Sequence, residues 1–212
     1  MMLVRSCVLT AGVLLTGSSS PLVAQTFDSV YTDLNVEQCG HRPGTQPEDH
    51  GYWRCNGYAG IPIRVAASDQ RMYMSFGRKA ADQPAAGQTF PSFNNVYKAR
   101  IEWRRKKTGD NATPFAAIVR WNVKIDDDDR PSRGRVLVVT RLGERVCHVG
   151  YVDALANKDA NAVARRLADE HAAHFDCGKD KRIVLGERGE SVAGIIEEIE
   201  GEAPQKNSAG EK

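Results

Sequence analysis

The clearest alternation of apolar and polar residues lies between residues 97 and 125. In "YKARIEW" (97–103) one face is charged and the other is apolar, the apolar positions being Tyr97, Ala99, Ile101 and Trp103. In "FAAIVRWNVKI" (115–125) the odd positions are again apolar. A period of two is typical of strands that are covered on one side. The turn-rich "KKTGDNATP" between the two stretches predicts an antiparallel hairpin.

Two more hairpins are predicted on either side of this pair. Residues 61–67 and 71–77 alternate and form the first, whereas residues 135–141 and 145–152 form the third. The "VLVV" of the third hairpin is apolar on both faces, which predicts a central strand whose second face is also covered. Residues 78–95 show little periodicity and are interpreted as a long loop. Loops of this length are often functional, so this one is a candidate binding surface.

One helix is strongly indicated. The stretch "NKDANAVARRLADEHAAHF" (157–175) repeats apolar residues at i, i+3 and i+4 spacing and carries charges opposite them. Asn157 or Asp159 can cap its start, and Gly178 follows its end. This helix would cover the central strand. The predicted fold class is therefore α+β: an antiparallel meander sheet of five to six strands with one principal helix packed on it and two disulfides.

The two ends of the chain differ from the middle. Residues 1–24 combine Arg5, a short apolar run and small polar residues, which is the layout of a cleaved secretory signal peptide and predicts a periplasmic protein. No other apolar run approaches the roughly 20 residues of a membrane-spanning helix, so no transmembrane segment is expected in the mature protein. Residues 25–178 are interpreted as a single domain. Residues 179–212 form an acidic and polar tail with one short helix in "SVAGIIEEIE" and disorder elsewhere.

Four cysteines remain after the predicted signal segment, and in an exported chain they indicate two disulfides. Three connectivities are possible in principle. Cys39 and Cys55 flank a turn-rich loop that buries little apolar surface, which favours a bridge between them. Cys147 lies on a predicted strand and Cys177 follows the predicted helix, so a second bridge would hold the helix on the sheet.

A zinc site is the alternative for the stretch "EHAAHFDC" (170–177). His171, His174 and Cys177 at three-residue steps could supply part of a ligand set. Their spacing does not match the H-E-x-x-H motif, because Glu170 precedes His171. We therefore favour a packed His171 and a bridged Cys177. The acidic run 126–129 also lacks the spacing of a calcium loop and is interpreted as a solvated hairpin tip.

Evidence for catalysis is weak in the sequence. His148 is expected on the strand face opposite Tyr151, with Asp153 nearby, and such a pair could do acid–base chemistry. No nucleophile motif accompanies it, so a structural hydrogen bond is favoured, and we predict no catalytic residue and no cofactor. A hydrolytic or metal-dependent periplasmic enzyme that uses His148, His171 and His174 remains the alternative function.

Charge narrows the class of partner. Without Arg5 the chain has 28 basic and 27 acidic residues, which argues against a nucleic-acid-binding protein. Basic residues nevertheless share the outer side of the central hairpin, and the candidate contact residues are Lys98, Arg100, Arg104, Arg120 and Lys124. We interpret the protein as a non-enzymatic binding module, for example an inhibitor, that uses this face and the 78–95 loop. An envelope protein or an anionic envelope polymer would be the partner; the alternative is an ordinary charged face.

Four phrases occur together in order: "YTDL" (31–34), "WRCNGYAGIPI" (53–63), "VLVVTRLG" (136–143) and "CHVGYVDALANKDAN" (147–161). Over residues 27–177 the chain thereby resembles a family of small exported bacterial proteins with no established activity. The resemblance implies export and supplies no catalytic residues.

Overall fold

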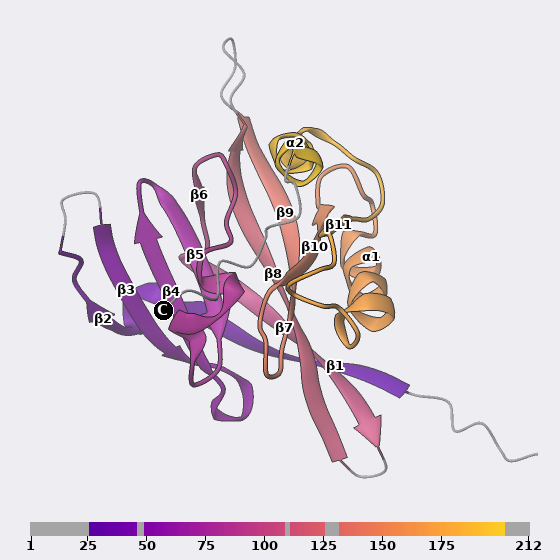
Figure 1. Ribbon diagram of the computed structural model, residues 1–212, viewed down its shortest axis with the longest axis horizontal. Coiled ribbons are helices and arrows are strands. Elements are labelled where there is room, and N and C mark those ends of the chain that lie inside the picture. Colours follow the sequence, from indigo (N-terminus) through magenta and orange to yellow (C-terminus); the bar gives the residue numbers. More distant parts are fainter. Residues whose placement is uncertain (1–25, 46–48, 109–110, 126–131, 202–212) are drawn as a thin grey trace, which may run out of the picture.

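Two sheets and a helical layer make up the body of the protein (Figure 1). The computed structural model describes residues 26–45, 49–108, 111–125 and 132–201. The predicted signal peptide and the acidic run 126–129 lie outside these residues. The smaller sheet packs on one face of the larger sheet. Helix α1 (Ala160–Leu167) and the π-helical turn after it (Ala168–Ala172) form a helical layer on the other face.

The larger sheet has seven strands in the order β1-β7-β8-β9-β10-β11, with β6 beside β8. The strands are β1 Thr26–Asn35, β6 Asn94–Asn95, β7 Lys98–Thr108, β8 Asn111–Ile125, β9 Ser132–Arg141, β10 His148–Asp153 and β11 Ile183–Val184. The two predicted hairpins within this sheet are confirmed, because β7 pairs with β8 and β9 with β10 in antiparallel register.

The prediction of a purely antiparallel meander is wrong. Strand β11 runs parallel to β10, and the chain reaches it only after passing through the helical layer. A parallel pair needs such a crossover, so no hairpin signal marks it in the sequence. Gly150 lets β11 come close, since a Cβ at that position would lie 2.1 Å from the carbonyl oxygen of Ile183.

The smaller sheet has four strands in the order β2-β3-β4-β5. They are β2 Gly40–Arg42, β3 Asp49–Asn56, β4 Pro62–Ser68 and β5 Arg71–Phe76. The predicted first hairpin is confirmed as β4 and β5, but it belongs to this separate sheet and does not extend the larger one. Short 3-10 helices lie at Val36–Gln38, Tyr58–Gly60, Ala80–Asp82, Pro84–Ala86 and Glu190–Val192.

Two apolar cores lie on the two faces of the larger sheet. The core between the sheets contains most of the largest fully buried side chains, among them Trp103, Trp121 and Tyr151. The second core lies under the helical layer and includes Val139, Val149 and Leu167. The "VLVV" stretch alternates between the two cores, which confirms the prediction that its strand is central and covered on both faces.

The helical layer is shorter and less regular than predicted. Helix α1, Ala160–Leu167, continues into a π-helical turn, Ala168–Ala172. Asp159 takes the N-cap position without a side-chain hydrogen bond; its carbonyl oxygen accepts from the N–H groups of Ala162 and Val163 instead.

A second helix, α2 (Ala193–Gly201), corrects the prediction of one principal helix. It is the short helix expected in the tail. Val192, just before it, and Ile195 within it are buried in the core between the sheets. Arg182, ahead of it, donates to Glu198 at 3.0 Å. The folded body therefore includes this part of the predicted tail.

Both predicted disulfides are present. Cys39–Cys55 ties the start of β2 to β3. Cys147–Cys177 ties the residue before β10 to the segment that follows the π-helical turn, and so fastens the helical layer to the sheet. Because Cys177 is bridged, the zinc alternative loses its thiolate ligand.

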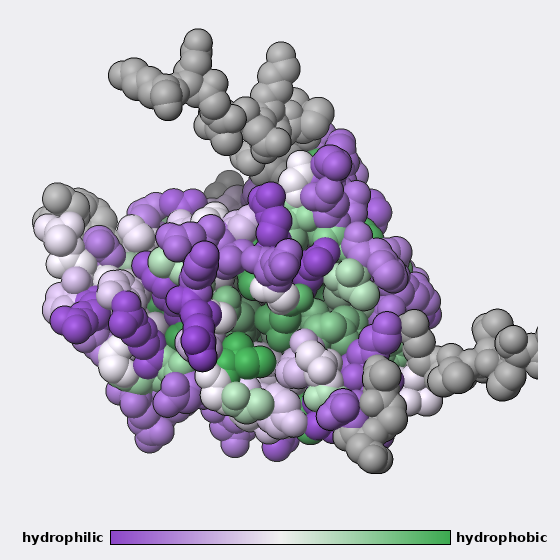
Figure 2. Space-filling view, turned by 60° about the horizontal axis from the view of Figure 1, so that its bottom comes forward, coloured by the Kyte–Doolittle hydropathy of each residue, from purple (hydrophilic) through white to green (hydrophobic). Residues whose placement is uncertain are grey.

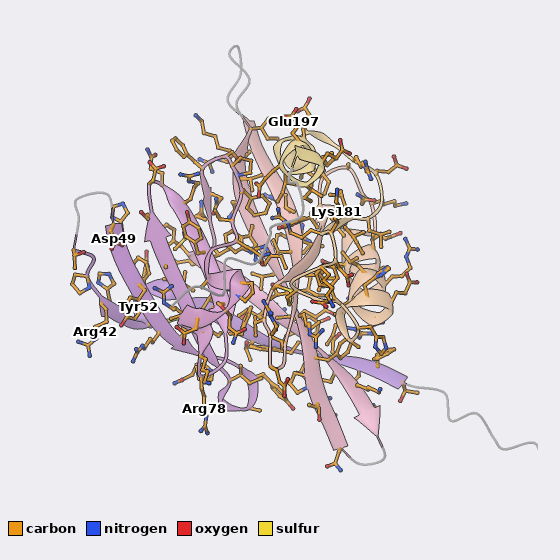
Figure 3. The ribbon with its side chains drawn as sticks, in the orientation of Figure 1. Arg42, Asp49, Tyr52, Arg78, Lys181 and Glu197 are labelled. Carbon is orange, nitrogen blue, oxygen red and sulfur yellow. A yellow bond between two sulfur atoms is a disulfide. The ribbon has the colours of Figure 1, made fainter. Side chains whose placement is uncertain are left out.

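Most of the visible surface is hydrophilic, with hydrophobic residues showing in a hollow on one face (Figure 2). Arg42, Asp49 and Tyr52 lie on the smaller sheet, away from the helical layer (Figure 3). There the Arg54 and Arg64 guanidinium groups lie 5.5 Å and 4.7 Å from the Tyr52 ring centroid.

Within the described ranges, no helix is both long enough and apolar enough to cross a membrane.

Candidate ligand-binding site

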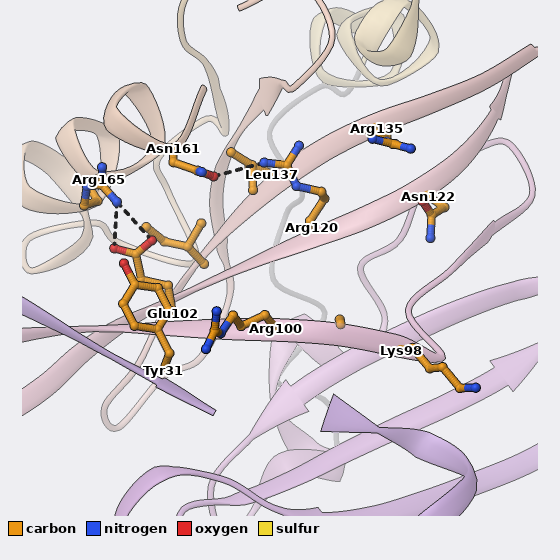
Figure 4. Close-up of a pocket in the computed structure, with 12 residues that line it drawn as sticks. Tyr31, Lys98, Arg100, Glu102, Arg120, Asn122, Arg135, Leu137, Asn161 and Arg165 are labelled. Atoms are coloured by element: carbon orange, nitrogen blue, oxygen red, sulfur yellow. Dashed lines mark hydrogen bonds and ion pairs between the residues drawn. The ribbon is translucent and has the colours of Figure 1, made fainter. Parts of the chain in front are cut away.

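Three of the five predicted contact residues line one cavity on the outer face of the larger sheet (Figure 4). Lys98 and Arg100 extend from β7, and Arg120 extends from β8. The cavity has a volume of about 350 Å³ and lies beside α1, which contributes Asn161 and Arg165. Because α1 covers only part of this face, the polar residues next to it stay open to solvent.

Arg104 does not belong to this cavity, and its predicted exposure is wrong. Its side chain is only 9% exposed. The guanidinium donates from Nε and Nη2 to the two carboxylate oxygens of Asp169, at 2.9 Å and 2.5 Å. Nη1 donates to Ser29 Oγ at 2.9 Å. Arg104 therefore joins the sheet to the π-helical turn and is not available to a partner.

Glu102 provides the acidic group of the cavity. It accepts from Ser29 Oγ at 2.5 Å and from Arg165 Nη1 at 3.3 Å, the second contact being drawn in Figure 4. Its side chain is nearly buried, and Arg165 is about one-third exposed. Because this carboxylate is paired with Arg165, it neutralises the charge of Arg165. It does not neutralise the other cations of the cavity.

Arg120 and Arg135 bring two guanidinium groups into the same cavity (Figure 4). Arg120 donates to Asn161 Oδ1 at 3.0 Å. Partial burial lowers the pKa of Arg120 below its usual value, and the positive charge of Arg135 lowers it further. Neither arginine forms an ion pair with any residue that the structure describes. An anion placed between them would remove this repulsion.

A second cavity of about 790 Å³ adjoins the first, because Asn122 and Arg135 line both. It extends along the ends of β8 and β9, where Lys124 lies opposite Arg133. Lys124, the remaining predicted contact residue, also has its Nζ 5.4 Å from the Phe93 ring centroid. We call the two adjoining cavities the basic groove.

The basic groove is strongly cationic. Its lining includes eight basic residues and one acidic residue, Glu102; the basic ones are Arg71, Lys98, Arg100, Arg120, Lys124, Arg133, Arg135 and Arg165. This local excess contrasts with the nearly balanced charge of the chain. The charge is therefore concentrated by the fold and not by overall composition.

Sequence reasoning missed Arg133 and Arg135. They occupy alternate positions just before the "VLVV" stretch, and that alternation was a usable signal. The register of β8 and β9 places Arg135 opposite Asn122 and Arg133 opposite Lys124. Asn161 and Arg165 are also part of the cavity, but only the docking of α1 brings them there.

Most of the 78–95 loop is anchored in the interior. Val146 N–H donates to Gln83 Oε1 at 2.8 Å, and His148 N–H donates to Gln88 Oε1 at 2.7 Å. Ala85 and Phe90 are fully buried. Only its last residues, from Phe93 on, line the basic groove. The loop therefore supports the core with its body and can contribute to a binding surface at its end.

The three histidines of the alternative enzyme do not form one site. His148 lies on the inner face of the sheet, with its ring next to Trp121 and Tyr151. His171 and His174 belong to the helical layer, on the other face. His171 is half-exposed, and so is not the packed residue that its spacing predicted. No cluster of three or more potential metal ligands occurs among the described residues.

His148 and Tyr151 lie on the same side of β10, contrary to the predicted alternation. A bulge between His148 and Gly150 shifts the register, and the His148 ring nitrogen Nδ1 lies 3.0 Å from Tyr151 Oη. Tyr151 Oη also accepts from Arg182 at 3.1 Å. Burial, followed by the positive charge of Arg182, lowers the pKa of His148 to about 3.

This histidine should make the protein sensitive to acid. Its folded pKa lies below the unfolded value of 6.5, so the unfolded chain binds the proton more readily between these values. The stability that neutral His148 contributes is present above pH 6.5 and is lost as pH falls towards 3. The loss should reach about 2 kcal/mol at pH 5. In urea unfolding, His148→Asn should reduce the difference between pH 7 and pH 5 by that amount.

His174→Asn is the matched control, because His174 is exposed. It should leave the difference between pH 7 and pH 5 unchanged. An equal pH dependence in wild type and His148→Asn would show that His148 does not cause the acid sensitivity.

Comparisons of the chain with protein families, with curated proteins and with solved structures give no match. The resemblance to exported bacterial proteins therefore stays a prediction, and function has to be inferred from the basic groove.

Proposed function

We propose that the protein is an exported, non-enzymatic binding module that holds an anionic partner in the basic groove. The observation that carries this proposal is the lining of the groove, which among the described residues holds eight cations and one carboxylate, Glu102. Arg71, Arg100 and Arg165 pair with Asp69, Asp33 and Glu102, whereas Arg120 and Arg135 form no ion pair with any described residue. Concentrated like charge costs folding free energy, and an anionic ligand would offset that cost on binding. Among the predicted contact residues, Lys98, Arg100, Arg120 and Lys124 take part, and Arg104 does not.

The proposed location is the periplasm. Two disulfides favour an oxidising compartment, which is consistent with export of the chain. Anionic polymers and proteins of the cell envelope would be the available partners there. A histidine-based enzyme gains no support, since its three residues lie in separate surroundings and His148 is held neutral in the core.

Charge reversal at two arginines tests the proposal. Fluorescein-labelled dextran sulfate, a generic polyanion, should bind the wild-type protein at low salt, and binding should weaken as salt is raised. Arg120→Glu with Arg135→Glu should weaken it about a hundredfold, or ~2.7 kcal/mol, because both side chains line the groove. Fluorescence anisotropy measures the affinity.

The control variant makes the same charge change on the smaller sheet. Arg42→Glu with Arg54→Glu alters two exposed arginines outside the groove and should change affinity less than about threefold. Equal weakening by both pairs would mean that only overall charge matters. That result, or no binding by the wild type, would contradict the proposed function.

A further inference from the structure

The basic groove is too long for a single small anion. Its cations occur at successive register positions of β8 and β9: Arg120 beside Leu137, then Arg135 opposite Asn122, then Lys124 opposite Arg133. Side chains on one face of a strand repeat about every 7 Å, so these positions span about 14 Å. A phosphate or an acetate would contact one position, whereas an extended polymer can contact all three.

Exposed apolar side chains gather in the same groove. Among the described residues the large hydrophobic side chains that remain exposed are Tyr31, Phe93, Tyr97 and Leu155, with exposures of 48%, 38%, 42% and 57%. Tyr31 lines the first cavity, and the other three line the second. Scattered exposed apolar residues are ordinary, but a set confined to one site indicates a surface that a ligand covers.

Amide side chains complete the chemistry of the groove. Asn122 is common to both cavities, Asn161 lies in the first and Asn95 in the second. Asn122 donates to Asn95 Oδ1 at 3.3 Å, which leaves further donors and acceptors on both amides for a ligand. The groove thus offers cations for carboxylates, aromatic rings for apolar ring faces, and amides for hydroxyl groups.

Sugar acids match all three features. A pyranose ring has C–H groups on its faces, hydroxyl groups around its edge and, in a uronic acid, one carboxylate per ring. Resting on the proposed function, we propose that the anionic partner is an acidic polysaccharide whose chain runs through both cavities of the basic groove. Tyr31 would pack against a sugar ring at one end, and Phe93 and Tyr97 at the other.

Two other polymers fit less well. An acidic peptide that bound by strand pairing would need a free sheet edge, but the first cavity lies on a sheet face formed by β7, β8 and β9, and of the edges of the larger sheet only the two-residue strand β6 borders the second. A single-stranded nucleic acid could stack its bases on the aromatic rings. However, the disulfides favour a compartment outside the cytosol, where nucleic acid is not the usual partner.

Oligogalacturonates of defined length provide the test, with isothermal titration calorimetry of the purified protein. The hexamer is long enough to enter both cavities and should bind at least about tenfold more tightly than the dimer, ~1.4 kcal/mol. A neutral maltohexaose should not bind. An affinity that is the same for dimer and hexamer would overturn the proposal of a polymer that spans the groove.

Aromatic substitutions test the role of the rings. Phe93→Ala with Tyr97→Ala should lower the hexamer affinity about tenfold. A dimer that occupies the first cavity does not reach these two rings, so its affinity should stay unchanged. Tyr31→Ala should weaken both. Tyr52→Ala, on the smaller sheet, is the matched control and should weaken neither. Unchanged hexamer affinity in the Phe93 and Tyr97 variant would contradict the sugar contacts.

Competing polyanions separate failure of this inference from failure of the proposed function. Hexaglutamate and a six-nucleotide single-stranded DNA should bind more weakly than the galacturonate hexamer. If either binds more tightly and Arg120→Glu with Arg135→Glu abolishes that binding, the polysaccharide is excluded and the basic groove stands as an anion site. If no polyanion binds, both proposals fail.

Discussion

Replacing Cys147 and Cys177 together by alanine should lower the free energy of unfolding by about 3.6 kcal/mol. The bridge closes a separation of 30 residues, and the chain-entropy estimate for such a loop gives this value. The closed loop contains β10, α1 and the π-helical turn. Urea denaturation, followed by circular dichroism, would measure the loss.

The location of the effect is as informative as its size. Hydrogen exchange in residues 160–172 should speed up in this variant, because the helical layer loses its covalent attachment to the sheet. Cys39→Ala with Cys55→Ala should cost about 3 kcal/mol for its separation of 16 residues and should leave exchange in the helical layer unchanged. A loss below about 1 kcal/mol on removing the longer bridge would contradict its proposed role.

Asp169→Ala should cost about 3 kcal/mol of stability, the second large effect. Arg104 is almost fully buried, and the carboxylate of Asp169 accepts two of its three side-chain hydrogen bonds. Removing the acid leaves a buried positive charge that donates only to Ser29 Oγ among the described residues, and such uncompensated charges are strongly destabilising. Asp169 is itself 24% exposed, which places the estimate at the lower end of the usual range.

A double variant separates the charge from the packing. Arg104→Met with Asp169→Leu removes both charges and keeps apolar volume, so it should recover most of the lost stability. Glu170→Ala, in the same turn but with an exposed side chain, should change stability by a few tenths of a kcal/mol. If Asp169→Ala cost no more than Glu170→Ala, the buried pair would have no structural role.

The two variants also bear on the basic groove. Neither Cys147 nor Asp169 lines it, yet α1 supplies Asn161 and Arg165 to its first cavity. Loosening the helical layer should therefore weaken polyanion binding indirectly. A stability measurement has to accompany each binding measurement on these variants.

Local pattern predicted the hairpins because side-chain alternation is decided by neighbours along the chain. Strand β1 was missed although it makes ten register pairs with β7, because its partner lies more than 60 residues away and the turn-rich segment after it dominates the composition. Strand β3 was hidden by the same segment. The candidate site was predicted in part for the same reason: alternation identified Arg100 and Arg120, and the register of β8 and β9 showed that Arg135 lies beside them.

Alternation also failed where the backbone or the packing departs from a regular strand. Arg100 and Arg104 share a face of β7, but the π-helical turn covers only the Arg104 end, so one is exposed and the other buried. His148 and Tyr151 were expected on opposite faces, and a bulge places them together. The alternation of apolar and polar residues in the sequence predicts neither the burial of Arg104 nor the shared face of His148 and Tyr151.

The sequence alone predicted the α+β class, the central strand covered on both faces and the favoured pairing of the four cysteines, because each follows from periodicity or from position along one segment. Tertiary structure alone decided that the strands form two sheets, that β11 returns parallel to β10, and that eight cations meet in one groove. These features depend on which surfaces pack together over long separations. Such packing is a balance of burial over the whole chain, and no local pattern reports it.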